Sequence, residues 1–130
     1  MRDKPSGDLL VEAVARFLRE ELLPQLDATA GFKTRVAANA LDIAIREMRG
    51  GAAADASEIN RLASLLGHDG DLATLNRELC AAIRAGDVTL ATSGLSEHLW
   101  ATTLDKLAIE QPTYASYRRA LEIRAKGEAS

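Results

Sequence analysis

The chain has 130 residues, enough to bury one hydrophobic core but not two, and its apolar (47%) and charged (27%) fractions are those of a globular protein. Sixteen basic and 19 acidic residues give a net charge of −3, which argues against nucleic-acid binding, because such proteins neutralise phosphates with clustered lysine and arginine. No stretch approaches the roughly 18 apolar residues of a membrane span, and acidic residues interrupt any export signal near the N-terminus.

The first predicted element is an amphipathic helix over residues 7–23. Leu10, Val14 and Phe17 follow one another at the three- and four-residue spacing that places side chains on one helical face. Ser6 is the expected N-cap, and Pro24 ends the helix because proline lacks the backbone donor that a helix needs.

The remaining elements follow from the same periodicity, interrupted by glycine and proline. We expect the Gly50-Gly51 pair to stop a central helix, and Asp55 and Glu58 to form a capping box for the next one. Residues 87–94 are expected to form a loop. The sequence therefore predicts further helices at residues 31–49, 55–66, 72–85, 95–110 and 113–125.

Together these elements predict an all-α protein, a single domain over residues 1–130. We expect one compact bundle of about six helices, with the central helix at residues 31–49. The polar N-terminus, about five or six residues long, and the polar tail at 126–130 are expected to fray.

The central predicted helix carries one line of polar residues: Arg35, Asn39, Asp42, Arg46 and Arg49. At 100° per residue they fall within about 80° of one another. One interpretation is a solvated helix face with an Asp42–Arg46 pair. The other is a positively charged ridge that binds an anion or an acidic protein surface, since arginine suits phosphate and carboxylate.

A second candidate surface lies near the C-terminus, where Tyr117 and Arg118 follow Tyr114 on the last predicted helix. These side chains either pack in the core or form a partly exposed interface, because tyrosine and arginine are common anchors of protein interfaces.

Motifs for catalysis, metals and cofactors are missing from the sequence. His68 and His98 lack a neighbouring nucleophile or orienting partner, and no histidine or cysteine pair has metal-ligand spacing. We therefore expect no catalytic residue, no metal and no cofactor. The single Cys80 stands among apolar residues and is expected to be packed, which favours a reducing, cytoplasmic location.

Three stretches carry a resemblance to a known group: RDKPSGDLLVEAVARFL, FKTRVAANALDIAIREM and KLAIEQPTYASYRRA. Together they resemble an uncharacterised bacterial family of small helical proteins that contain a domain of unknown function. Members of that family are typically encoded beside aminoglycoside-phosphotransferase-like kinases and acyl-CoA dehydrogenases. The resemblance implies no catalytic residue.

The function that this resemblance implies is that of an accessory protein. We expect a non-enzymatic partner of an aminoglycoside-phosphotransferase-like kinase in acyl-CoA or hydroxy-acid metabolism, with a homodimer as a further possibility. The alternative is an enzyme or small-molecule-binding protein that holds an anion, a phosphate or coenzyme A on the arginine ridge. Neither interpretation involves nucleic acid or a membrane.

Overall fold

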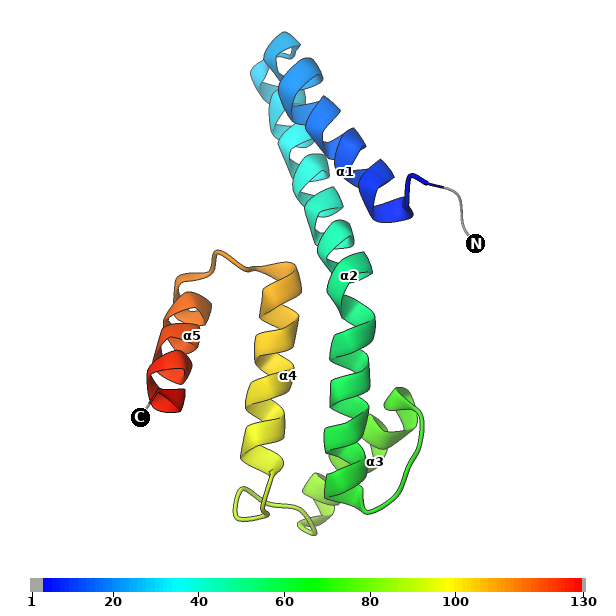
Figure 1. Cartoon of the computed structure of the whole chain (residues 1–130), viewed down its shortest axis with the longest axis vertical. Helices are drawn as coiled ribbons and strands as arrows, with labels where there is room; N and C mark the ends of the chain where they lie inside the picture. Colours follow the sequence, from blue (N-terminus) through cyan, green and yellow to red (C-terminus); the bar gives the residue numbers. More distant parts are fainter. Residues whose placement is uncertain (1–3, 130) are drawn as a thin grey trace. The chain divides into compact units, whose positions relative to one another are not determined.

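The computed structural model describes residues 4–129 (Figure 1). Its elements in chain order are α1 (Gly7–Phe17), a π-helical segment (Leu18–Leu22), a 3-10 turn (Leu23–Gln25), α2 (Ala28–Leu66), α3 (Leu72–Ala85), α4 (Leu95–Glu110) and α5 (Ala115–Glu128). No strand occurs among these residues, so the predicted all-α class is confirmed.

Helix α2 is longer than the sequence predicted. Its backbone stays helical through Gly50 and Gly51, so the helices expected at residues 31–49 and 55–66 form one element, and the described chain has five α-helices rather than six. Neither glycine has a positive φ angle. Each costs the helix only about 1 kcal/mol relative to alanine, so the pair weakens α2 without ending it. The predicted capping box at Asp55 and Glu58 was therefore wrong, because both residues lie inside the helix.

The other predicted boundaries agree with the structure or differ by a few residues, except for that of the first helix. The helix predicted over residues 7–23 is α-helical only to Phe17 and continues as the π-helical segment to Leu22, just before the turn that contains Pro24. Helices α3 and α4 have the predicted bounds, and residues 87–94 form a loop. Helix α2 begins three residues early because Asp27 caps it, its carboxylate accepting a hydrogen bond of 2.8 Å from the amide of Ala30. Helix α5 begins two residues late, after an extended Tyr114, and continues to Glu128.

The chain divides into two compact units, residues 1–51 and 52–130. We call them the N-terminal and C-terminal units. The first contains α1 and the early part of α2; the second contains the rest of α2 and the three later helices. The single-domain organisation stays a prediction, and the expected frayed ends include residues 1–3 and 130, which lie outside the described residues.

Small side chains form the buried seam of the N-terminal unit. Ala15 of α1 and Ala38 of α2 are almost fully buried, and among residues 4–51 Ile45 is the one large side chain that is comparably buried. Short side chains let two helix backbones approach closely. As a result, the seam covers only part of the apolar arc of each helix.

The C-terminal unit has a conventional aliphatic core. Leu62 of α2 packs with Leu75 and Leu79 of α3, and the cluster is completed by Val88 from the following loop and Leu95 from α4. Asp71 caps α3 by accepting a hydrogen bond from the amide of Thr74. Cys80 of α3 is exposed and does not belong to this core, so its predicted burial was wrong.

Gly50→Ala should stabilise the protein. Space around the Gly50 Cα is open, and its helical backbone suits alanine, so we expect the free energy of unfolding to rise by about 0.5–1 kcal/mol. Urea denaturation followed by circular dichroism measures the change. Gly67→Ala is the matched control: Gly67 has a φ of +80°, and the same substitution should destabilise there. A destabilising Gly50→Ala would contradict an unbroken α2.

Candidate functional site

Part of the polar line on α2 faces the segment that follows α1, within the N-terminal unit. The guanidinium of Arg19 donates two hydrogen bonds to the Asp42 carboxylate, at 3.0 and 2.5 Å, and a third to the Asn39 amide oxygen at 2.9 Å. Arg19 lies in the π-helical segment. This bidentate geometry is the strongest form of an arginine–carboxylate pair, and it links the π-helical segment to α2.

A second ion-pair group lies further along the same seam. The Arg49 guanidinium donates to the Asp8 carboxylate at 2.9 Å and to the Glu12 carboxylate at 3.4 Å. Asp8 also accepts a hydrogen bond from the hydroxyl of Ser6. Ser6 therefore occupies the N-cap position as predicted, but its side chain holds Asp8 rather than a helix amide.

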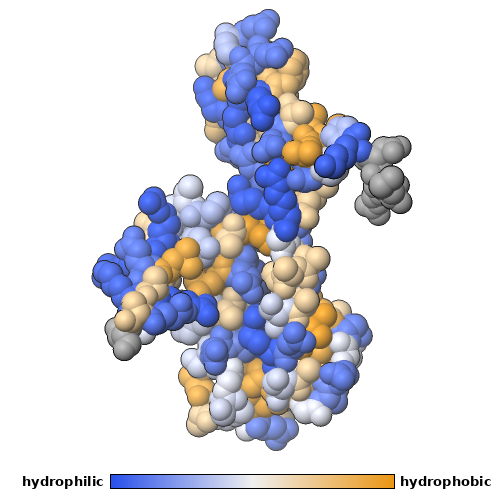
Figure 2. All heavy atoms as spheres, in the orientation of Figure 1, coloured by the Kyte–Doolittle hydropathy of each residue, from blue (hydrophilic) through white to orange (hydrophobic). Residues whose placement is uncertain are grey.

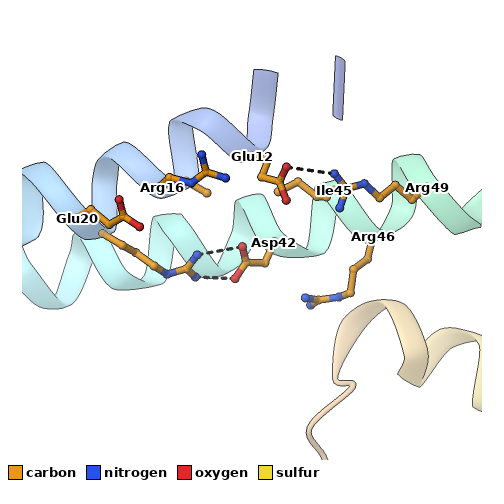
Figure 3. Close-up of a pocket in the computed structure, with 9 residues that line it drawn as sticks. Glu12, Arg16, Glu20, Asp42, Ile45, Arg46 and Arg49 are labelled. Carbon is orange, nitrogen blue, oxygen red and sulfur yellow. Dashed lines mark hydrogen bonds and ion pairs between the residues drawn. The ribbon is translucent and has the colours of Figure 1, made fainter. Parts of the chain in front are cut away.

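These pairs border a groove of about 380 Å³ between the two helices (Figure 3). Four arginines and three carboxylates contribute to its lining, so its formal charge is only slightly positive. The charged residues are Arg16, Arg19, Arg46, Arg49, Glu12, Glu20 and Asp42. A groove in which carboxylates nearly balance guanidinium groups offers an anion less attraction than the predicted ridge of three arginines and one aspartate would.

The pKa values of the paired groups show the same coupling. The hydrogen bonds from Arg19 hold the pKa of the Asp42 carboxyl below its usual range, with a smaller contribution from the charge of Arg46. In turn, the hydrogen bond to Asp42 raises the pKa of Arg19. Asp42 and Asn39 therefore serve as hydrogen-bond partners of Arg19 within the protein. Arg35, at the start of the polar line, is exposed.

The opposite side of α1 is apolar and exposed. Leu10, Val14 and Phe17 are each about half exposed, although the sequence suggested a core-facing stripe. Met48 of α2 lies beside this stripe, because its terminal methyl group would be 2.8 Å from a Cβ added to Gly7, and it too is about half exposed. We call Leu10, Val14, Phe17 and Met48 the apolar face; Figure 2 shows hydrophobic residues at the surface of this unit.

The second predicted surface belongs to the C-terminal unit. Tyr117 is half-buried, whereas Arg118 is exposed and lines a shallow hollow on α5 together with Arg119 and Glu122. Tyr114 is about half exposed. The two candidate surfaces therefore lie in different units of the chain.

His98 is buried, which the sequence did not indicate. It is only 3% exposed, on α4, and its Nδ1 atom has no hydrogen-bond partner among the described residues. Burial lowers its pKa, and the neighbouring charge of Arg61 lowers it further, opposed by Glu58. The other histidine, His68, is exposed, and its Nε2 atom lies 2.7 Å from the Glu78 carboxylate.

Among residues 4–129, no three histidine, cysteine, aspartate or glutamate side chains come together in a way that could hold a metal ion. Within the same range, no helix is both long and apolar enough to cross a membrane.

Comparison with known proteins identifies a family over most of the chain. Residues 24–114 match the family described as "Domain of unknown function (DUF6285)". No curated protein matches the sequence, and no solved structure does.

Asp42→Asn should destabilise the N-terminal unit. The amide is isosteric with the carboxylate but leaves the Arg19 charge unpaired, so we expect a loss of about 1 kcal/mol in the free energy of unfolding, measured by urea denaturation. Arg35→Gln serves as the control, because Arg35 is exposed, and it should change stability by less than about 0.5 kcal/mol. Equal effects of the two substitutions would remove the special role of the Arg19–Asp42 pair.

His98 should make stability fall in mild acid. Its folded-state pKa lies below the ordinary value of 6.5, so the unfolded chain binds more protons as the pH falls through that value, and unfolding becomes easier. The raised pKa of His68, which is hydrogen-bonded to the Asp69 carbonyl and faces the Glu78 charge, acts in the opposite direction. We therefore expect His98→Leu in a His68→Gln background to flatten the fall of the melting midpoint below about pH 6.5. An unchanged pH profile would contradict the lowered pKa.

Proposed function

The chain belongs to the DUF6285 family, whose function is unknown, and on this premise we propose that it is a non-enzymatic accessory protein that binds another protein through the apolar face. The partner that we propose is an aminoglycoside-phosphotransferase-like kinase, as the family resemblance of the sequence implies. The observation that carries the proposal is the exposure of Leu10, Val14, Phe17 and Met48 on one side of the N-terminal unit.

An exposed apolar face of this kind supports protein binding for a physical reason. Single apolar side chains are common on protein surfaces, but neighbouring ones that stay in contact with water usually mark an interaction site. Leu10 and Val14 are separated by one helical turn, and Met48 approaches the start of the same helix from α2. Burying such a group against a partner removes apolar area from water, at roughly 25 cal/mol per Å².

The polar groove supports a structural role better than a binding role. Its arginines and carboxylates nearly balance, and two of its arginines, Arg19 and Arg49, already form ion pairs across the helix seam. An anion would have to compete with Asp42 and Glu12 for these groups. We therefore favour the accessory protein over an enzyme or binding protein that uses the arginine line.

Leu10→Asp should disrupt the proposed complex. A carboxylate in the centre of a buried interface is costly, so we expect the dissociation constant to rise tenfold or more when the protein is titrated with an aminoglycoside-phosphotransferase-like kinase from the same genome. Isothermal titration calorimetry on the purified proteins measures the change.

Leu9→Asp provides a matched control. Leu9 is 45% exposed against 54% for Leu10, but it lies seven residues before Arg16 and so on the side of the polar groove. We expect less than a twofold effect there. Absence of any complex at micromolar concentrations would contradict the kinase partner. A loss of stability on Leu10→Asp as large as that of a core substitution would show that Leu10 is packed within the protein itself.

A further inference from the structure

A second hollow, in the C-terminal unit, lies outside both predicted surfaces. It is a groove of about 580 Å³ formed by α4, α5 and the later part of α2. Trp100 and Leu104 of α4 line it together with Ala120 and Ile123 of α5. Figure 2 shows apolar residues between α4 and α5. A volume of this size lies in the range of small-molecule sites, which are mostly apolar with a few polar groups at defined points.

The apolar lining of this groove is unusually open. Trp100, the only tryptophan of the chain, is 62% exposed, and so is Ile123 opposite it on α5. Tryptophan carries the largest apolar surface of any side chain, and its exposure in a hollow leaves a flat ring available for stacking. The alanines at 101 and 120 keep the space beside the ring clear.

The polar groups of the groove include two arginines. Arg61 and Arg124 line it together with the Glu97 carboxylate, and each arginine also forms an ion pair with a carboxylate outside the lining, Asp105 for Arg61 and Glu128 for Arg124. Arg124 is already paired with Glu128 at 3.2 Å on the outer part of α5. Arg61 is the more deeply placed of the two arginines, with its side chain 25% exposed against 59% for Arg124.

Arg61 is held in position but is only partly satisfied. One of its terminal nitrogens donates to the Thr102 hydroxyl at 3.3 Å and to the Asp105 carboxylate at 3.4 Å, both long for hydrogen bonds. Its Nε atom is buried and has no hydrogen-bond partner among residues 4–129. Arginine has five N–H donors in a planar arrangement that matches a carboxylate, so this side chain has capacity for one more acceptor.

We propose that this groove binds a small amphipathic carboxylate. The apolar body of the ligand stacks on Trp100 and contacts Leu104 and Ile123, and its carboxylate accepts hydrogen bonds from Arg61 after a small rotation of the guanidinium. None of the residues that line this groove belongs to the apolar face, so the argument for it does not rest on the proposed kinase complex.

Phenylbutyrate and phenylbutanol form a pair of probes for this site, since they share an apolar body and differ in charge. Trp100 is the only tryptophan, so its fluorescence reports on this groove alone. We expect phenylbutyrate to give a saturable change in that fluorescence, with an affinity tenfold or more above that of phenylbutanol. Equal affinities would overturn the assignment of the anion to Arg61. The absence of a saturable signal at millimolar phenylbutyrate would overturn the site.

Two variants and a control locate the binding. Arg61→Met keeps the aliphatic stem and removes the charge, so it should lower the phenylbutyrate affinity about tenfold and leave phenylbutanol unchanged. Ala120→Phe should fill the groove and abolish binding of both probes, which keeps the test decisive if Arg61→Met does not fold. Arg119→Met, on α5 next to Ala120 but outside the groove, should leave both affinities unchanged. If Arg119→Met lowered the phenylbutyrate affinity as much as Arg61→Met, the effect would come from the net charge of the protein, and the site would be overturned.

Discussion

Two paired helices can bury only the side chains along their shared seam, and that constraint determines which side chains of the N-terminal unit stay exposed to solvent. Each helix has one apolar arc, but the seam between α1 and α2 is built from Ala15, Ala38 and Ile45. Small residues bury little of the apolar arc, since their main effect is to let the two helix backbones approach closely. The larger residues on the same arc, such as Val14 and Phe17, therefore stay in contact with water.

A seam with so few large side chains is poorly specified by packing, and charged side chains supply the missing alignment. The Arg19–Asp42 pair and the Arg49 contacts with Asp8 and Glu12 lie along one border of it. A shift of one helix by a turn would separate all of these partners, although each pair is 25–45% exposed and contributes only modestly. The polar residues of α2 therefore favour one register of α1 against α2, while the binding capacity that we propose lies on the apolar side of these helices.

Local features of the sequence predicted the elements well. Periodic apolar residues indicated the helices, and Gly67, Gly86 and Pro112 lie within two residues of the ends of α2, α3 and α4, because each of these signals acts on the backbone locally. The Gly50-Gly51 pair misled the prediction for a related reason. A glycine that adopts a positive φ, such as Gly67, ends a helix, whereas Gly50 and Gly51 keep helical angles. The sequence alone does not distinguish these two kinds of glycine.

The candidate sites were less predictable, because they depend on which elements meet. The line from Arg35 to Arg49 was visible from its spacing, but its partner Arg19 lies 23 residues before Asp42 and carries no local mark. The groove at Trp100 requires α5 to return alongside α4, and nothing in the periodicity of either helix specifies that. Its one available signal was the isolated tryptophan on a helix whose other large apolar residues are aliphatic.

The glycine pair within α2 also affects how the protein opens. Helix formation is cooperative, so a helix of 39 residues would ordinarily make all the segments that pack against it unfold together. Two adjacent glycines place the weakest helical turn of α2 at residues 50–51, which is also where the two units divide. Local unfolding of α1 and the early part of α2 can therefore stop at this point, and the aliphatic core around Leu62 can persist as a separate cooperative unit.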